Sequence, residues 1–148
     1  MSETLLNLLS SPAESPRQCT EEDIRQLMLA ARLAPSAENY QTWRFVQVKD
    51  EGRKAAVLGA MEPEETQQFL NCPHLFVLGG VKKTPAWRIP NQPFIATNGG
   101  IALAHVWLLA REKGIGFRYT VQFDETAVAG AVGRRKKGTR FLAVLGVG

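Results

Sequence analysis

Short polar side chains gather in one stretch of the chain, between a helix-like segment and a strand-like segment. Residues 30–48 read AARLAPSAENYQTWRFVQV, and Ser36, Asn39 and Gln41 follow closely on Pro35. Hydroxyl and amide groups donate and accept hydrogen bonds without adding charge, which suits the polar edge of an aromatic ligand. The same residue types also cap and turn chains everywhere. On residue types alone, the turn interpretation is favoured over a ligand contact.

Two regular elements must position this stretch. Thr20 and Asp23 form a capping-box pattern, and the apolar residues that follow recur at helical spacing, which predicts a helix over 21–33. Pro35 disfavours helical geometry at the preceding residue and ends that helix. Residues 44–48 alternate in β-favouring side chains and predict a strand. A loop held between two such elements is a common place for ligand contacts.

The remaining pattern predicts a mixed fold. Strands are expected at 74–81, 117–123 and 139–148, and helices near 5–9, at 51–61, at 63–70, at 94–113 and after Asp124. The order has no dominant βαβ rhythm, so we predict an α+β fold in a single domain over 1–148, with an irregular arm over 1–20. Apolar residues on more than one face of the 94–113 segment predict a central, largely buried helix. The Gly99–Gly100 pair in that helix lowers helix propensity, and we expect it to permit close packing.

Composition and charge narrow the functional classes. The chain has 148 residues and a net charge of +4, with its Lys and Arg residues scattered along the sequence, so we expect an anionic small-molecule ligand and no nucleic acid. Cys19, Cys72, His74 and His105 have no metal-ligand spacing, which predicts free thiols and no metal site. The N-terminus lacks a basic signal-peptide region, and the apolar run 101–110 is too short to cross a bilayer. We therefore expect a cytoplasmic protein that does not enter a membrane.

Three segments in the correct order resemble the flavin-dependent nitroreductase family. AARLAPSAENYQTWRFVQV is similar to that family's helix ending in APS, followed by an Asn and by QPW before a strand. GGIALAHVWLLAREKGIGF resembles its long central helix and GLG turn, and FLAVLGVG resembles its late LG strand. The resemblance covers roughly residues 21–148. Three ordered matches are far more specific than one short motif.

This resemblance implies a cofactor, a partner and a reaction. It implies an α+β sandwich with a mixed, mostly antiparallel sheet flanked by helices, and a homodimer that binds FMN between its protomers. By the same resemblance Pro35, Ser36, Asn39 and Gln41 face the flavin and Gly116 lines it. Electrons would pass from NADH or NADPH to a nitro compound, a quinone or a similar small acceptor, with the cofactor supplying the chemistry. No catalytic side chain is then required.

The sequence also departs from the family pattern, above all where the FMN phosphate should bind. An arginine-rich RRSxR segment is replaced by SSPAESPRQCT, which leaves Arg17 as its cation. Arg118, just beyond the GIG turn, is a second candidate, weighed equally against a simple exposed strand arginine. A basic turn formed by Arg134, Arg135, Lys136 and Lys137 is a third candidate, although such turns are more often solvated loops. Thr42 stands where proline is usual.

Two other interpretations follow from these departures. The chain stops at Gly148, short of the family's usual tail, so the resemblance describes a compact member shortened at both ends. A nitroreductase-like binding or regulatory protein that has lost FMN and catalysis is therefore one alternative. A flavin enzyme with a specialised reaction is the other, because one fold can host many chemistries. If FMN is retained, weaker binding is expected, since each lost charge-assisted hydrogen bond is worth roughly 1.5–3 kcal/mol.

Overall fold

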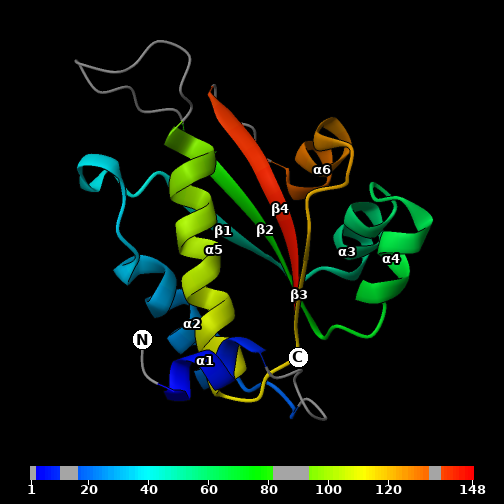
Figure 1. Ribbon diagram of the computed structural model, residues 1–148. Coiled ribbons are helices and arrows are strands. Elements are labelled where there is room, and N and C mark those ends of the chain that lie inside the picture. Colours follow the sequence, from blue (N-terminus) through cyan, green and yellow to red (C-terminus); the bar gives the residue numbers. More distant parts are fainter. Residues whose placement is uncertain (1–2, 11–16, 82–93, 134–137) are drawn as a thin grey trace.

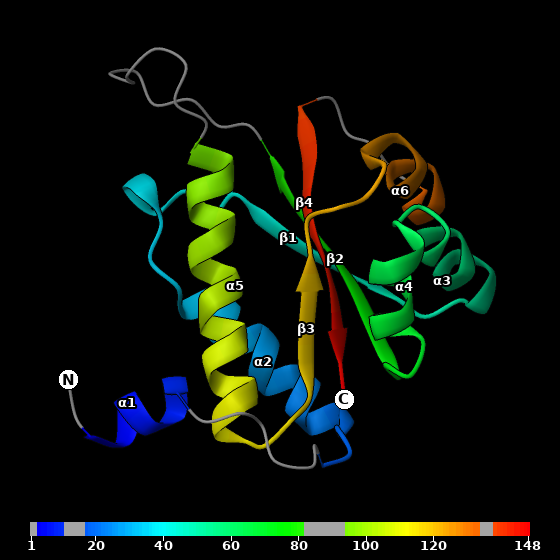
Figure 2. The same cartoon turned by 45° about the vertical axis from the view of Figure 1, so that its right-hand side comes forward.

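A four-stranded antiparallel sheet with helices on both faces forms the protein (Figures 1 and 2). The structure is a computed structural model that describes residues 3–10, 17–81, 94–133 and 138–148. The helices are α1 (Glu3–Ser10), α2 (Glu21–Leu33), the 3-10 turn η1 (Ala37–Asn39), α3 (Glu51–Leu58), α4 (Pro63–Phe69), α5 (Phe94–Glu112) and α6 (Glu125–Val132). The strands are β1 (Trp43–Val48), β2 (His74–Val81), β3 (Phe117–Thr120) and β4 (Thr139–Val147).

The strand order in the sheet is β1-β2-β4-β3, and each adjacent pair is antiparallel. Trp43 lies opposite Gly80 at the start of β1, and Phe117 lies opposite Val147 at the start of β3. β1 and β3 are therefore the two edges. The predicted α+β class is confirmed. The sheet is antiparallel throughout its four strands, and not mixed as predicted. Among the described residues, parallel pairing is confined to an isolated bridge between Arg17 and Ile115.

Alternating side chains of the central strands build a hydrophobic core on each face of the sheet. On β2, Phe76 and Leu78 belong to the core beneath α2 and α5, whereas Leu75 and Val77 belong to the core beneath α3, α4 and α6. Figure 1 shows the same division, with α2 and α5 on one side of the sheet and the three short helices on the other. Burial on both faces explains why β2 and β4 are nearly continuous apolar runs.

α5 covers the sheet with one stripe of its surface. Its buried residues recur every three or four positions and are Ile95, Asn98, Gly99, Ala102, Val106 and Ala110. The outer positions Gly100 and Ala104 are exposed, and Trp107 is half-buried. The predicted central position is confirmed, but the prediction of a largely buried helix is wrong for the single chain. On its other faces Ile101, Leu103 and Leu109 are half-buried and pack against the same core, and α1 and α2 also contact the helix.

The glycine pair on α5 has two different environments. A Cβ atom on Gly99 would overlap with the Leu142 side chain of β4, so this glycine lets the helix approach the sheet. A Cβ atom on Gly100 would meet no described atom within 4 Å. The prediction of close packing is thus confirmed for Gly99 alone in the single chain.

Other element boundaries differ modestly from the predictions. β3 ends at Thr120 rather than residue 123, because the Thr120 hydroxyl accepts a hydrogen bond from the Gln122 backbone at 3.0 Å and turns the chain. α3 and α4 end at Leu58 and Phe69, slightly earlier than expected. The short helix predicted near 5–9, within the irregular arm over 1–20, is present as α1.

Gly146 lies where β4 passes close to the end of α4, so we expect Gly146→Ala to destabilise the fold. A Cβ atom there would lie 2.6 Å from the Cys72 sulfur and 3.0 Å from the Phe69 ring. Moving these groups should cost about 1–3 kcal/mol in the free energy of unfolding, measured by urea denaturation. Gly130→Ala on exposed α6 is the matched control, because its Cβ meets nothing and should add up to about 1 kcal/mol of stability. Equal effects of the two substitutions would contradict this packing.

Candidate functional site

The polar loop, residues 35–42, connects α2 to β1 and carries most of the predicted flavin contacts. The Ser36 hydroxyl accepts a hydrogen bond from the Gln41 backbone at 3.0 Å, which closes the loop. The Gln41 side-chain amide donates to the Asn39 side-chain oxygen at 3.3 Å. Pro35, Asn39 and Gln41 are exposed, and Ser36 is half-buried. The loop therefore presents two amide side chains to its surroundings while its backbone is internally bonded.

The backbone of this loop is unusual. Glu38, Asn39 and Gln41 have φ values of 49°, 55° and 48°, in the left-handed region that residues other than glycine seldom occupy. Such residues cost about 1–3 kcal/mol each and persist where the surrounding structure determines them, often at ligand sites. A hydrogen bond between Glu38 and Tyr40 raises the pKa of the tyrosine. The conformation is thus specified by contacts and not by glycine.

Asn98 on α5 makes two side-chain hydrogen bonds to the polar loop, and sequence reasoning missed it. Its side-chain oxygen accepts a hydrogen bond from the Ala37 backbone at 3.0 Å. Its side-chain nitrogen donates to the Thr42 hydroxyl at 3.3 Å. Asn98 and Thr42 are each 1% exposed. An amide in the mostly apolar first half of α5 is the available signal, because buried amides need partners.

The other predicted site residues lie at the start of β3. We call Arg17, Gly116 and Arg118 the β3 corner. Arg17 forms an isolated β-bridge with Ile115, and the Arg17 backbone N–H donates a hydrogen bond to the Gly114 carbonyl at 3.0 Å. The Gly116 carbonyl accepts a hydrogen bond from the Gly148 backbone at 2.8 Å. Segments far apart in the sequence therefore meet here, near the C-terminus shown in Figure 2.

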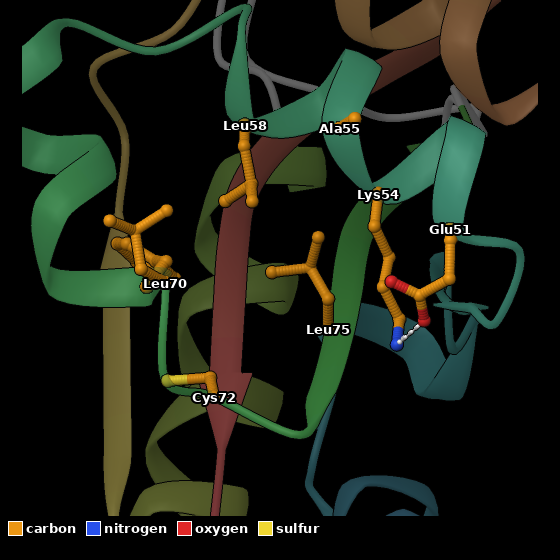
Figure 3. A pocket seen from close by; sticks show the side chains of 8 residues that line it. Glu51, Lys54, Ala55, Leu58, Leu70, Cys72 and Leu75 are labelled. Carbon is orange, nitrogen blue, oxygen red and sulfur yellow. Dashed lines mark hydrogen bonds and ion pairs between the residues drawn. The ribbon is translucent and has the colours of Figure 1, made fainter.

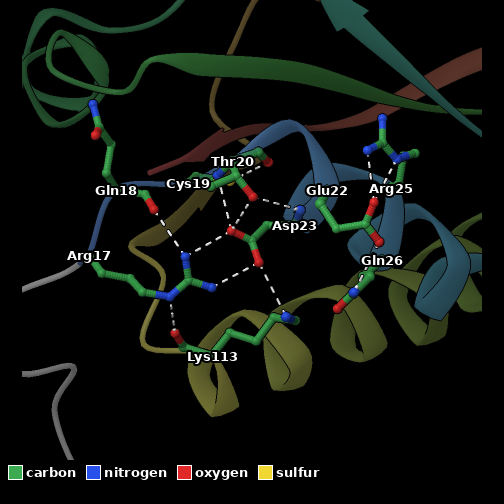
Figure 4. A network of polar contacts seen from close by, with 9 residues as sticks. All are labelled: Arg17, Gln18, Cys19, Thr20, Glu22, Asp23, Arg25, Gln26 and Lys113. Carbon is green, nitrogen blue, oxygen red and sulfur yellow. Dashed lines mark hydrogen bonds and ion pairs between the residues drawn. The ribbon is translucent and has the colours of Figure 1, made fainter.

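The Arg17 guanidinium is committed to partners within the chain (Figure 4). It donates two hydrogen bonds of 2.8 Å to Asp23 and another of 2.8 Å to the Lys113 carbonyl. The Lys113 ammonium lies 3.2 Å from Asp23, and the Thr20 backbone and hydroxyl also donate to this carboxylate. Hydrogen bonding by Arg17, followed by that of Thr20, holds the pKa of Asp23 well below its usual range. This network ties α2 to the end of α5.

We expect the Asp23 network to make the protein sensitive to acid. The carboxylate pKa is lower in the folded chain than its value of about 3.9 in an unfolded chain, so its stabilisation is complete above that value and is lost as pH falls below it. Asp23→Asn should lower Tm at neutral pH and flatten the decline of Tm below about pH 4. Glu22→Gln, in an exposed pair with Arg25, is the control and should change Tm little. An unchanged pH dependence in Asp23→Asn would argue against this role.

Arg118 is exposed and makes no ion pair with a described carboxylate. Phe117 packs into the core beneath α5, so strand alternation directs Arg118 to the opposite face of the sheet. In agreement, the charge of Arg118 opposes the effect of burial on the pKa of Cys72, which lies near α4. The β3 corner therefore brings Arg17 and Arg118, which are far apart in the sequence, to the start of β3 but on different faces of the sheet.

One chain does not bring the polar loop and the β3 corner together. Asn98 contacts the loop and Lys113 contacts Arg17, at opposite ends of α5. These helix positions are about 15 residues apart, which at 1.5 Å per residue separates the two regions by roughly 22 Å. The loop also precedes β1 whereas the corner precedes β3, and these strands form opposite edges of the sheet. The predicted site residues thus fall into two separate groups.

Gln41 also lines an open hollow of about 360 Å³ between α2 and β1. Its other lining residues are Met28, Ala31, Arg32, Trp43, Arg44 and Phe45. Arg44 donates hydrogen bonds to the Trp43 carbonyl at 2.6 Å and to the Gln41 carbonyl at 3.1 Å. This side of the polar loop is therefore accessible and carries positive charge.

A second hollow, of about 180 Å³, lies on the other face of the sheet beside α3 and α4 (Figure 3). Leu58, Leu70 and Leu75 line it, and Lys54 pairs with Glu51 at 2.7 Å along its margin. The half-buried Cys72 lies at one end, and burial raises the pKa of its thiol. Both cysteines are free, as predicted, and Cys19 is buried. None of the predicted site residues lines this hollow.

Several remaining candidates have simple positions. Trp43 is buried in the core, as its place before a strand suggests. His105 contacts the Ile101 carbonyl at 2.9 Å through its Nδ1 atom. The basic turn at 134–137 lies outside the described residues. In the part of the chain that the structure describes, no helix is both long enough and apolar enough to span a bilayer.

Comparison with known proteins identifies related sequences. The model of the nitroreductase family matches residues 15–148. The chain is 27% identical over 139 residues to a 5,6-dimethylbenzimidazole synthase from Rhodospirillum rubrum, covering 76% of this chain and 64% of that protein. It is 38% identical over 63 residues to a putative NADH dehydrogenase/NAD(P)H nitroreductase from Archaeoglobus fulgidus, covering 39% and 36% respectively. The chain thus spans less than two thirds of the length of these curated relatives.

Solved structures share the fold. A nitroreductase family protein from Clostridium novyi NT superimposes with a TM-score of 0.83 at 18% identity, over 97% of this chain and 83% of that one. An iodotyrosine deiodinase bound to FMN and 3-iodo-L-tyrosine superimposes with a TM-score of 0.75 at 22% identity, over 97% and 88%. The family match covers most of the sequence, and the α+β architecture agrees with it. The chain belongs to the nitroreductase family.

Proposed function

We propose that the protein is an FMN-dependent oxidoreductase that uses NADH or NADPH. The observation that carries this proposal is the polar loop, whose left-handed backbone is held in place while Asn39 and Gln41 remain exposed. Membership of the family supports the proposal, as do the FMN in the superimposed deiodinase and the NAD(P)H in the name of the Archaeoglobus relative. The proposal concerns the cofactor and the reductant, and the acceptor is left as a class.

The polar loop fits the ring system of a flavin. The Asn39 and Gln41 amides can each donate and accept hydrogen bonds, which matches the alternating donors and acceptors along an isoalloxazine edge. Their mutual hydrogen bond of 3.3 Å is long, and both side chains are exposed, so exchanging it for ligand contacts costs little. Pro35 fixes the entry into the loop. These are uncharged contacts that orient a ring and do not neutralise a phosphate.

The phosphate end fits less completely. Arg17 would have to leave the Asp23 carboxylate to bind a phosphate fully, which would leave this nearly buried negative charge with only Thr20 and Lys113 as partners. Arg118 has no described counter-ion and is the cation we assign to the phosphate. One cation in place of several supports weaker FMN binding than in members with an arginine-rich N-terminal segment.

We further propose that the cofactor lies between two copies of the chain. The polar loop and the β3 corner are roughly 22 Å apart within one chain, along the 1.5 Å rise of α5, so a partner must supply one of them. The outer face of α5 supports this pairing, because Gly100 and Ala104 permit close approach and Trp107 is only half-buried. A two-fold axis would create two equivalent sites, each with the loop of one chain and the corner of the other.

When bound, FMN would supply hydride transfer from NADH or NADPH to a small acceptor such as a nitro compound or a quinone. The chain would contribute orientation and charge. Asn39 and Gln41 would hold the ring edge, and Arg118 would hold the phosphate. No side chain is assigned as a catalytic acid, base or nucleophile, and the acceptor would reach the ring from the open side of the loop.

A specialised reaction is a second candidate, supported by one observation. The relative that aligns with 76% of the chain is named for the synthesis of 5,6-dimethylbenzimidazole and not for nitro reduction. The scaffold can host either reaction, because the acceptor is chosen by residues around the ring. We propose the general oxidoreductase class, with the acceptor to be found by screening.

Flavin titration of the purified protein tests the proposal. We expect quenching or enhancement of FMN fluorescence at a saturable site, and loss of the visible flavin absorption when NADH or NADPH is added without oxygen. Saturable binding that no reductant bleaches would favour a flavin-binding module over an enzyme. Absence of FMN binding would instead support the alternative in which the cofactor has been lost.

A further inference from the structure

Asn98 connects both ends of the polar loop to α5. Its side-chain oxygen accepts a hydrogen bond from the Ala37 backbone at the beginning of η1, and its side-chain nitrogen donates to the Thr42 hydroxyl just before β1. Every residue with a left-handed backbone in the loop lies between these two contacts. A single side chain therefore spans the segment that carries Asn39 and Gln41.

Thr42 extends this connection into the sheet. Its backbone carbonyl accepts a hydrogen bond from Val81 at the end of β2, at 2.9 Å. Its hydroxyl is the acceptor for Asn98, and a proline at this position could not provide it. The departure from the family pattern at residue 42 thus has a structural partner in Asn98. The two residues link α5, the loop and β2 through buried hydrogen bonds.

The need for such a connection follows from the backbone conformation. Three residues with Cβ atoms occupy the left-handed region, and no glycine lies in the loop to relieve them. These conformations persist when the surroundings determine them. The hydrogen bonds that Ser36 accepts from the Gln41 and Asn39 backbones lie within the loop and move with it, whereas the Asn98 bonds attach the loop to the rest of the protein.

We propose that Asn98 and Thr42 are a positioning pair that sets the ligand-binding conformation of the polar loop. Neither residue is expected to touch the ligand, because both are buried. They act through Asn39 and Gln41, whose direction depends on the loop backbone. The part of the inference that concerns flavin rests on the proposed function. The part that concerns the loop conformation does not.

Hydrogen exchange of the flavin-free protein tests the loop conformation directly. Asn98→Leu keeps a similar volume but removes both bonds, and Thr42→Val keeps the shape but removes the acceptor. We expect each variant to accelerate amide exchange over residues 36–42 about tenfold or more, with β2 and β4 unchanged. Asn98→Asp should restore slow exchange, since a carboxylate accepts from Ala37 and the Thr42 hydroxyl can turn to donate to it.

Titration with riboflavin and FMN tests the link to binding. If the wild type binds flavin, each of the variants Asn98→Leu and Thr42→Val should weaken the binding of FMN and of riboflavin by the same factor. The reason is that the loop faces the ring and not the phosphate. Asn98→Asp should bind both as the wild type does. The double variant Asn98→Leu/Thr42→Val should lose no more affinity than the worse single variant, as expected for one shared connection.

The two measurements separate the inference from the proposed function. Exchange that rises uniformly across the protein, or that stays slow over 36–42, would overturn the positioning role whatever the flavin result. Faster local exchange in a protein that binds no flavin would support the positioning role and refute the proposed function alone. If Asn98→Leu fails to fold, Thr42→Val and Asn98→Asp still decide the outcome.

Discussion

Replacing Arg118 by alanine is expected to weaken FMN binding about ten- to a hundredfold and to leave riboflavin binding unchanged. FMN and riboflavin share the ring system and differ in the phosphate, so the ratio of their dissociation constants isolates the phosphate contact. Arg118 is the cation we expect to dominate, because it has no described counter-ion while Arg17 is bound to Asp23. Rising salt should weaken FMN more than riboflavin.

Controls distinguish this contact from a general charge effect. Arg53→Ala removes the same charge from an exposed position on α3, which contacts β1 at the opposite edge of the sheet from β3, and should leave both affinities unchanged. Asn39→Ala should weaken FMN and riboflavin alike, because Asn39 is assigned to the ring. Equal weakening of both flavins by Arg118→Ala, or no weakening of either, would refute the assignment of Arg118 to the phosphate.

A charge placed on the outer face of α5 should both separate the proposed dimer and abolish FMN binding. Ala104 is exposed in the single chain, so Ala104→Glu should leave the fold intact. In a close pairing of two α5 helices, the carboxylate would be buried without a partner, which strongly disfavours association. Light scattering should then report a monomer at concentrations where we expect the wild type to form the proposed dimer.

The matched control for this variant is Ala127→Glu, at an exposed position on α6. It introduces the same residue on the opposite side of the sheet and should change neither the mass in solution nor the FMN affinity. A monomeric Ala104→Glu protein that binds FMN as tightly as the wild type would show that the site lies within one chain.

Local signals made much of the fold predictable. The Thr20–Asp23 capping box and Pro35 indicate the bounds of α2. Asp124 indicates the start of α6, because its carboxylate accepts hydrogen bonds from two first-turn N–H groups at 2.8 and 3.0 Å. Apolar alternation located β1, and continuous apolar runs located β2 and β4. Burial of α5 was overestimated, because apolar residues on several faces do not reveal whether they meet the same chain or another.

The candidate site was less predictable, because its contacts join distant residues. The sequence suggests Arg17 as a phosphate-binding cation, yet its guanidinium is held by Asp23 and the end of α5, which local sequence does not reveal. Asn98 lies more than 50 residues after Thr42, and only the packing of α5 onto the sheet brings the two together. The polar loop itself was identified because its residues are consecutive.

Complementation between two binding-defective chains tests the proposed FMN site between two copies most directly. One variant carries Arg118→Ala, and the other carries Asn39→Ala with Gln41→Ala, so each should bind FMN poorly alone. In mixed dimers one of the two sites combines the intact loop of one chain with the intact corner of the other. We therefore predict that co-expressed chains recover about a quarter of the wild-type high-affinity sites. Recovery of none, with mixed dimers confirmed by mass, would contradict a site shared between two copies.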